Sequence, residues 1–406
     1  MKKIYKLYKY TKDEGIVKTA NRTLKYAAKK IIRTKDVIDV MADIDDIVAA
    51  DYVHNPYTSP AKIPKTGTLD IAWVLSPLSK GAGGQNTITR FARYLKQQGH
   101  NITFYIYEGI QAQSVQEASE LLKNSFKLDV EVRKIKDYRE SDALIATGWE
   151  TAYPAFNIKT KAHKFYFVQD FEPYFYGVGS RYVLAENTYR MNFYGITAGP
   201  WLTKKVSEYG MNADYFDFGA DLDIYKPKTM IARKKKICFY ARPVTERRAF
   251  EIGVIALEIF HKKHPEYEID FFGWDVSNFK IPFEYENRAI LNHHELADLY
   301  QESVACLVMS LTNVSLLPLE LIASGCIPVM NEGDNNRMVL HGMDKYVDYA
   351  PTSPIELADA LCAAVERNDI DTHAADASNS VSSLSWDSSY EKVERIIKRE
   401  VVGSES

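Results

Sequence analysis

The strongest constraint on the fold lies in residues 305–330, ACLVMSLTNVSLLPLELIASGCIPVM, where two apolar runs flank a polar loop and a short helical segment. Ala305–Ser310 and Cys326–Met330 are predicted to be buried strands. Between them we expect a helix that Ser315 caps and that ends at Gly325, a residue able to adopt a left-handed conformation. A strand–helix–strand unit of this kind predicts a parallel α/β sheet.

The start of this helix is also the first candidate binding site. Its free backbone N–H groups would lie at the C-terminal edge of a parallel sheet, where anionic ligands commonly bind. Glu320 lies one turn into the helix, and its carboxylate can accept hydrogen bonds from two vicinal hydroxyls. One hypothesis is therefore a nucleotide, with its phosphates on the amides and its ribose on Glu320. The other is that Glu320 only complements the helix dipole.

The rest of the chain repeats the strand–helix pattern, and 406 residues exceed one ordinary core. We expect two Rossmann-like, doubly wound α/β domains that face each other across a cleft. The first is assigned to residues 67–226 and the second to residues 227–382. Residues 1–66 are assigned to a basic helical arm with a linker, and residues 383–406 to a helix that returns to the first domain.

The basic arm contrasts with the net charge of −3 for the whole chain. Residues 1–36 hold twelve Lys and Arg against three acidic residues, and residues 16–32 form an amphipathic helical pattern. Such a helix can lie on an anionic membrane surface. The alternative is an arm that packs on its own domain or on a second subunit of a homodimer. Nucleic acid is not expected as a partner, because no sheet with stacking aromatic residues is near.

Several classes of protein are disfavoured by composition. No window holds eighteen apolar residues, and the N-terminus lacks the apolar core of a secretion signal. The four cysteines lie in apolar segments, and no His, Cys, Asp or Glu cluster has metal-ligand spacing. We therefore expect a cytoplasmic protein without a metal or a resident cofactor, either fully soluble or peripheral on the inner face of the membrane.

A glycine-rich loop follows the first predicted strand of the first domain. Gly81, Gly83 and Gly84 would let a diphosphate or a sugar approach the backbone closely. The loop does not match the dinucleotide pattern GxGxxG, because Asn86 occupies the place of the third glycine.

Two carboxylates follow a later strand of the same domain. Asp170 and Glu172 are placed to act as a general base or to bind sugar hydroxyls. The alternative is that they pair with Arg181 or Arg190 as structural ions.

Two arginines open the second domain. Arg242 lies just past the strand KICFYARP, and Arg247 lies at the start of the next helix. Arginines so placed can hold a diphosphate in a bidentate fork, and we favour this over salt bridges to Glu246 or Glu251. Gly273, at the end of the following strand, is predicted to border the same site.

The order of these motifs over residues 68–400 resembles a GT-B glycosyltransferase of the "glycosyltransferases group 1" type. The glycine loop resembles that family's acceptor-side loop, FDFGADLDIYKP its interdomain hinge, FYARPVTERRAF its V-G-R-x-x-x-E-K-G motif, and TNVSLLPLELIASGCIPV its E-x7-E region. A narrower similarity points to bacterial rhamnosyltransferases that use dTDP-L-rhamnose to build surface polysaccharide.

The resemblance implies metal-independent transfer of a sugar from a nucleotide-diphosphate donor to a glycan or lipid-linked glycan. Asp170 and Arg242 would be catalytic. The donor-binding set would be Arg242, Arg247, Asn313, Ser315, Leu316, Glu320 and Gly273, and the acceptor-side set Gly81, Gly83, Gly84 and Glu172. The alternatives are a nucleotide-sugar epimerase of the same fold and a catalytically inactive nucleotide-sugar-binding subunit.

Two positions depart from the family pattern. Thr312 replaces the first glutamate of E-x7-E, and Gln169-Asp170 stands where the family has a histidine and an aspartate. Both departures bear on whether transfer retains or inverts the configuration of the sugar.

Overall fold

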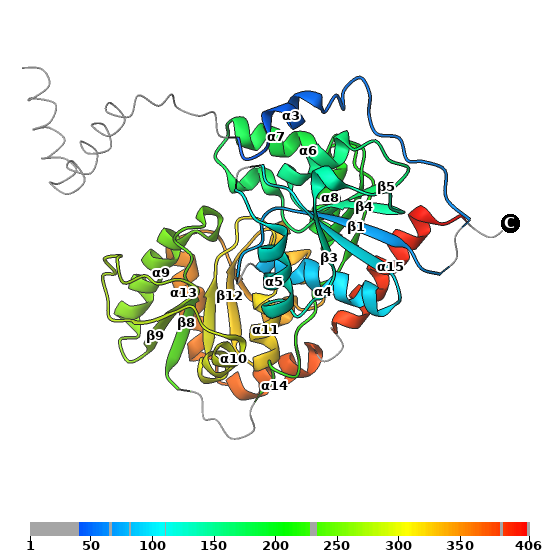
Figure 1. Ribbon diagram of the computed structural model, residues 1–406. Coiled ribbons are helices and arrows are strands. Elements are labelled where there is room, and N and C mark those ends of the chain that lie inside the picture. The colour runs from blue at the N-terminus through cyan, green and yellow to red at the C-terminus, as the bar shows by residue number, and fades with distance from the viewer. Residues whose placement is uncertain are drawn as a thin grey trace, which may run out of the picture. The chain divides into compact units, whose positions relative to one another are not determined.

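The computed structural model describes residues 40–64, 67–80, 83–109, 111–227, 234–381 and 385–403. Residues 41–406 form one compact unit, and it contains two parallel sheets (Figure 1). The predicted basic helix at residues 16–32 and the predicted site residue Gly81 lie outside the described residues. Within the described part of the chain, no helix has the length and apolar character needed to cross a bilayer.

The first lobe is built on a sheet of seven parallel strands in the order β3-β2-β1-β4-β5-β6-β7. Its strands are β1 (Asp70–Leu75), β2 (Asn101–Ile106), β3 (Glu131–Lys134), β4 (Ala143–Ala146), β5 (His163–Val168), β6 (Tyr194–Ala198) and β7 (Ala213–Phe216). All six residues of β5 are buried, as expected for a central strand covered on both faces.

Helices connect these strands in the right order for parallel crossovers. They are α4 (Gly83–Gln97), α5 (Val115–Asn124), α6 (Trp149–Asn157), α7 (Ser180–Thr188) and α8 (Pro200–Ser207), with short 3₁₀ turns η1 (Ile135–Asp137) and η2 (Glu172–Phe175). A further helix, α3 (Ile44–Ala49), precedes β1. The turn η2 follows β5 directly, so it lies at the C-terminal edge of the sheet, where ligands bind in open α/β folds.

The second lobe has six parallel strands in the order β10-β9-β8-β11-β12-β13. They are β8 (Lys236–Tyr240), β9 (Glu268–Phe272), β10 (Glu286–Ala289), β11 (Ala305–Val308), β12 (Ile327–Asn331) and β13 (Asp348–Ala350). The helical segments are η3 (Glu246–Arg248), α9 (Phe250–Lys263), α10 (His293–Glu302), α11 (Leu317–Ser324), α12 (Asp334–Arg337), η4 (Asp344–Tyr346), α13 (Pro354–Glu366) and α14 (Ile370–Val381).

Successive side chains along the strands of the second lobe point alternately into two different apolar cores. Ile237 and Phe239 of β8 pack with residues of α9 and α13, whereas Cys238 between them belongs to the core that contains α10 and α11. Because successive strand side chains point to opposite faces, one helix layer covers each face of the sheet. The predicted fold class, two Rossmann-like parallel domains, is therefore confirmed.

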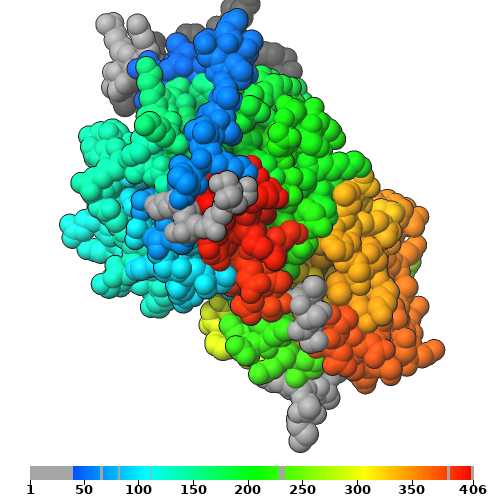
Figure 2. Space-filling view, turned by 90° about the vertical axis from the view of Figure 1, so that its right-hand side faces the viewer, coloured from blue at the N-terminus to red at the C-terminus, as the bar shows by residue number. Residues whose placement is uncertain are grey.

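The C-terminal helix α15 (Trp386–Val401) packs on the first lobe rather than on the second, beside α4 and β7. The ring of Trp386 lies 6.1 Å from that of Phe91 on α4, and Ser389 donates a 2.6 Å hydrogen bond to the carbonyl of Asp217. Ile63 donates to the carbonyl of Val401 at 2.9 Å, and Figure 2 shows the red C-terminal helix beside the blue segment that contains Ile63.

Candidate active site

The C-terminal ends of β8 and β9 position Arg242. Its Nη1 donates a 3.1 Å hydrogen bond to the carbonyl of Gly273, and its guanidinium lies over the ring of Trp274. Gly273 has φ +99°, and a Cβ at this position would come within 2.7 Å of the ring of Tyr240. Only glycine fits this turn without strain, so Gly273 is part of what holds Arg242 at the end of the sheet.

Two further arginines lie in the tight turn between β8 and α9. Arg247 and Arg248 belong to η3, and the turn closes at Ala249, whose φ of 42° and ψ of 48° are left-handed. A non-glycine residue in this region is strained by about 1 kcal/mol. Arg248 is only 9% exposed, and its Nη1 donates a 2.5 Å hydrogen bond to the hydroxyl of Ser310. Burial lowers the pKa of Arg248, because the charged form loses its hydration.

Asp170 is the anionic partner of this turn, although it comes from the other lobe. It follows β5 and is 8% exposed. Its Oδ2 accepts from Arg247 Nε at 3.2 Å and from Thr312 Oγ1 at 3.0 Å. Its Oδ1 accepts from the backbone N–H of Asn313 at 2.9 Å and of Phe171 at 2.8 Å. Three of the four donors belong to the second lobe, so Asp170 joins the C-terminal ends of the two sheets.

The charges at this junction do not balance. Arg248 interacts electrostatically with Arg242 and Arg247, and in the described part of the chain the one ion pair of these three arginines is that of Arg247 with Asp170. Three guanidinium groups and one carboxylate leave two positive charges uncompensated. Buried or half-buried cations are stable only with anionic partners, so the junction is suited to a ligand with about two negative charges.

The loop after β11 is held by a set of asparagine side chains. Asn331 and Ser310 exchange hydrogen bonds of 2.7 and 2.9 Å, and Asn336 donates to the carbonyl of Ser310 at 3.2 Å. Asn335 donates to the carbonyl of Thr312. These asparagine side chains hydrogen-bond the backbone of the loop and hold it in one conformation. The loop in turn fixes the orientation of Thr312 towards Asp170.

Asn313, a predicted donor-binding residue, bridges the lobes instead of lying open. Its Nδ2 donates to the carbonyls of Gln169 at 3.1 Å and Ala198 at 2.9 Å. The residue is 2% exposed, and its Oδ1 has no hydrogen-bond partner among the described residues. A buried acceptor without a hydrogen-bond partner lowers the stability of a fold. Oδ1 of Asn313 is such an acceptor among the described residues of the junction.

The helix start that the sequence predicted is present but shifted. α11 begins at Leu317, and its N-cap is Leu316, without a side-chain cap. The prediction that Ser315 caps this helix is therefore wrong. Leu316 already has helical dihedrals of −63° and −25°, and it leaves Ser315 outside the helix. The predicted end of the helix is confirmed, because Gly325 adopts the left-handed conformation with φ 79°.

Glu320 lies in the first turn of α11 and faces the hinge between the lobes. Burial, together with the nearby carboxylate of Asp221, raises the pKa of Glu320 to about 8, and Arg90 and Tyr225 act in the opposite direction. Arg90 of α4 pairs with Asp221 through both guanidinium nitrogens, one at 2.8 Å, and lies over the ring of Trp386. Burial therefore favours the protonated form of Glu320 near neutral pH.

The described part of the glycine loop touches the same junction. Gln169 Nε2 donates to the carbonyl of Gly84 at 3.1 Å, and a Cβ at Gly84 would lie 3.3 Å from that nitrogen. Gly83 is exposed, with no atom within 4 Å of an added Cβ. The structure thus brings Gly83 and Gly84 close to the Gln169-Asp170 pair.

Glu172 points away from this surface. It is 6% exposed, and its Oε2 accepts 2.6 Å hydrogen bonds from the backbone N–H of Trp149 and the hydroxyl of Tyr166. Burial and the carboxylate of Glu150 raise the pKa of Glu172 well above its usual value. It does not pair with Arg190, which binds Glu186 instead. Its place in the interior gives the acceptor-side assignment no support.

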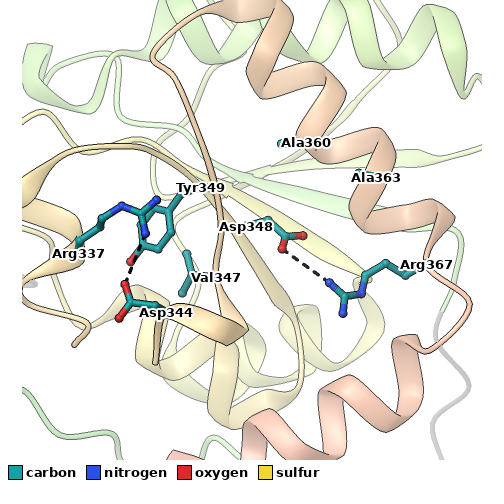
Figure 3. Close-up of a pocket in the computed structure, with 8 residues that line it drawn as sticks. All are labelled: Arg337, Asp344, Val347, Asp348, Tyr349, Ala360, Ala363 and Arg367. Carbon is teal, nitrogen blue, oxygen red and sulfur yellow. Dashed lines mark ion pairs between the residues drawn. The ribbon is translucent and has the colours of Figure 1, made fainter. Parts of the chain in front are cut away.

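A separate hollow of about 560 Å³ lies beside β13 and α13 in the second lobe. Figure 3 shows that it holds two arginines, with Arg337 stacked on Tyr349 and Arg367 reaching Asp348. Both arginines are already neutralised. Arg337 faces Glu332 at 2.9 Å and Asp344 at 3.8 Å, and Arg367 faces Asp348 at 3.7 Å and Asp369 at 3.0 Å. This hollow has no positive charge to offer an anion.

Sequence reasoning missed Arg248 and Arg90. Arg248 adjoins the predicted Arg247, and the family pattern has glycine there, so the doubled arginine was the available signal. Arg90 lies on α4, far from any motif, and only the fold brings it to the hinge. No group of three or more potential metal ligands occurs among the residues that the structure describes.

Two family models match the chain. Residues 96–198 match the model described as WsaF, N-terminal domain, and residues 235–362 match WsaF, C-terminal domain. The O-antigen biosynthesis protein RfbC of Myxococcus xanthus is 32% identical over 266 residues, which are 63% of this chain and 20% of that protein. The chain therefore spans about a fifth of the length of this curated relative.

Solved structures share the fold at low sequence identity. A sucrose-phosphate synthase from Thermosynechococcus elongatus aligns with a TM-score of 0.62 and 12% identity, over 81% of this chain and 98% of that one. Anabaena HepE, solved with UDP and glucose, aligns with a TM-score of 0.61 and 12% identity, over 81% of this chain and 99% of that one. The two lobes thus have the GT-B arrangement that the sequence motifs predicted.

Proposed function

We propose that this chain, whose lobes match the two WsaF domain models, is a glycosyltransferase that uses a nucleotide-diphosphate sugar. The observation that carries the proposal is the uncompensated pair of positive charges where the ends of the two sheets meet. A nucleoside diphosphate supplies the missing negative charge, and it would lie on Arg242 and Arg247 with Arg248 beneath them. The ribose would bind at Glu320, which can accept and donate hydrogen bonds when protonated.

The second lobe would stabilise the leaving group. The acceptor hydroxyl attacks the anomeric carbon, and the bond from that carbon to the diphosphate oxygen breaks. The electron pair leaves with the diphosphate, where the arginines and the N-terminus of α11 stabilise the developing charge. In this scheme the protein's own groups provide that stabilisation, as expected for metal-independent transfer.

The first lobe would receive the proton. Asp170 is the carboxylate nearest to the leaving-group arginines, and in an inverting displacement its Oδ2 takes the proton of the acceptor hydroxyl. In the ligand-free structure Oδ2 is occupied by Arg247 and Thr312. When the diphosphate engages Arg247, one position on Oδ2 becomes free for the acceptor. Contact between the lobes would also exclude water, which otherwise hydrolyses the donor.

The finer assignment is L-rhamnose transferred from dTDP-L-rhamnose to a growing surface glycan or lipid-linked glycan. It is supported by the similarity to RfbC, an O-antigen biosynthesis protein, and by the motif similarity to rhamnosyltransferases. The acceptor would enter beside Gly83 and Gly84. The basic arm would bring the enzyme to an anionic membrane surface, where lipid-linked acceptors lie, or would join two subunits.

Nucleotide release from dTDP-L-rhamnose, with and without an oligosaccharide or lipid-linked acceptor, tests the proposal. Release that depends on acceptor is expected. Interconversion of the nucleotide-sugar without acceptor would identify an epimerase. Binding without either reaction would identify an inactive binding subunit. A thermal-shift screen against a panel of nucleotide-sugars comes first, because a bound donor raises the unfolding temperature.

A further inference from the structure

The residue that departs most from the family pattern, Thr312, makes a direct contact with the proposed base. Its hydroxyl donates a 3.0 Å hydrogen bond to Asp170 Oδ2, although 142 residues separate the two in sequence. Thr312 is 1% exposed and Asp170 is 8% exposed. The contact is therefore a buried, charge-assisted hydrogen bond between the two lobes, of the kind that fixes geometry most strongly.

The surroundings leave Thr312 little freedom. Its carbonyl accepts from the side chain of Asn335 and, at 3.2 Å, from the hydroxyl of Ser310, which itself binds Arg248. The next residue, Asn313, donates its backbone N–H to the other oxygen of Asp170. The loop of the second lobe thus donates a hydrogen bond to each carboxylate oxygen of Asp170.

The replacement of glutamate by threonine has a physical reason at this place. A glutamate at position 312 would bring a second carboxylate against Asp170, and two carboxylates at hydrogen-bonding distance do not both ionise. Threonine instead supplies a hydroxyl donor to the ionised form of Asp170. The side chain at this position thus serves the carboxylate of the opposite lobe.

We propose that Thr312 is a positioning residue for Asp170: from the second lobe, its hydroxyl holds the carboxylate of the first lobe in the orientation that receives the acceptor's proton. This inference rests on the proposed function. When the donor diphosphate draws Arg247 away, the hydrogen bonds from Thr312 and from the backbone of Asn313 remain. Asp170 is then held in this orientation only while the loop after β11 contacts the end of β5. Proton transfer is therefore coupled to contact between the two lobes.

The test compares Thr312→Val, which keeps the shape and removes the hydroxyl, with Thr312→Ser, which keeps the hydroxyl. Ser303→Ala is the matched control, because Ser303 is a fully buried residue of the same lobe whose hydroxyl donates to Leu299 and not to the junction. The kinetic parameters for dTDP-L-rhamnose and its acceptor are measured from pH 4 to 9, with dTDP binding measured separately.

Thr312→Val is expected to lower kcat by about ten- to a hundredfold, the range typical of a misplaced general base. The dissociation constant of dTDP should change less than about twofold. The acid limb of the kcat/KM profile should move to higher pH, because a carboxylate that loses a donor to its charged form takes up a proton more readily. Thr312→Ser should stay within about threefold of wild type, and Ser303→Ala should leave the acid limb in place.

The other charged and titratable groups that face Asp170 stay the same in these variants. They are Arg247 and Arg248 of η3, Glu172 of η2 and Tyr189 at the end of α7. A moved acid limb in Thr312→Val therefore reports the lost hydroxyl.

Three results would overturn the inference. An unmoved acid limb with kcat lowered in Thr312→Val would mean a structural role only, and unchanged kcat would mean no role. Equal damage in Thr312→Ser and Thr312→Val would mean that retaining the hydroxyl does not preserve activity, so the hydroxyl would not be what residue 312 contributes.

A double-mutant cycle of Thr312→Val with Asp170→Asn needs no substrate. Additive shifts of the unfolding midpoint would refute the contact, and a coupled shift supports it.

Failure of the proposed function gives a different pattern. If wild-type protein binds no dTDP and Arg242→Ala changes nothing, the donor assignment falls whatever Thr312 does. If wild type binds dTDP and transfers the sugar while Thr312→Val is normal, only the positioning role falls.

Discussion

Two regions of the second lobe carry arginines, and they differ in charge balance. At the junction of the lobes, Asp170 pairs with Arg247 and acts electrostatically on Arg248, and among the described residues Arg242 has no ion-pair partner. In the hollow beside β13, two arginines face four carboxylates, of which Figure 3 shows Asp344 and Asp348. The hollow is an evident cavity, yet its arginines are already neutralised. Unpaired charge, rather than empty volume, is therefore the feature on which the proposed donor site rests.

The largest effect is expected at the junction itself. Arg242→Ala should lower sugar transfer by about a thousandfold, because a cation aimed at the developing diphosphate charge is lost. Its fold should persist, since among the described residues the side chain hydrogen-bonds only the carbonyl of Gly273 and otherwise lies over the ring of Trp274. Initial-rate kinetics and circular dichroism check this. Unchanged turnover would remove the arginine from the mechanism.

Asp170→Asn separates the role of Asp170 as proton acceptor from its role as the ion-pair partner of Arg247. Transfer should fall by about a hundredfold or more, because the proton acceptor is lost. Affinity for dTDP should rise by about fivefold, because Arg247 no longer has an anionic partner that competes with the diphosphate. Calorimetric titration measures the second effect, with Asp348→Asn in the hollow as the control. Equal or weaker dTDP binding by Asp170→Asn would break the charge comparison.

The buried carboxyl group of Glu320 predicts how the free energy of unfolding depends on pH. Burial raises the pKa of Glu320 from 4.5 to about 8. The folded protein then holds this proton more tightly than the unfolded chain, so Glu320 lowers stability as pH rises from about 5 to 8. Glu320→Gln should remove that loss and be more stable than wild type at pH 8, by on the order of 2 kcal/mol.

Urea unfolding at pH 5, 6.5 and 8 measures this difference. Asp348→Asn serves as the comparison, because burial also raises the pKa of Asp348 while Arg367 opposes the rise. A Glu320→Gln variant whose advantage does not grow with pH would contradict the assignment of a protonated Glu320.

The smallest effect is expected in the hollow. Arg367→Ala removes a half-exposed pair with Asp348 and Asp369, and exposed ion pairs contribute about 1 kcal/mol or less. Its unfolding midpoint should shift slightly, and its dTDP affinity should equal that of wild type. A clear loss of dTDP binding would mean that the hollow, and not the junction, holds the nucleotide.

The fold was predictable from local pattern. Apolar runs such as HKFYFV at β5 and ACLV at β11 are long enough and sufficiently β-branched or aromatic to be recognised as buried parallel strands. Gly325 was correctly identified as a helix end, because only its left-handed conformation continues the chain into β12. Ser315 was misread because a cap depends on backbone dihedrals at Leu316, which composition does not determine.

The site was predictable in part. The sequence placed Arg242, Arg247, Glu320 and Asp170 at strand ends and helix starts, and parallel sheets gather such positions at one edge. It did not show that Asp170 binds Arg247 and Thr312, because contacts between lobes depend on how the two sheets meet. It also did not show that Glu172 turns inward, since this residue begins the turn η2, four residues past β5, and its carboxylate there accepts from the backbone N–H of Trp149.

A crystal structure of the protein with dTDP bound would locate the donor site directly. We expect the diphosphate to lie within hydrogen-bonding distance of Arg242 and Arg247, Asp170 no longer to bind Arg247, and the ribose hydroxyls to reach Glu320. A nucleotide found away from Arg242 and Glu320, in the hollow beside β13 or elsewhere, would contradict this expectation.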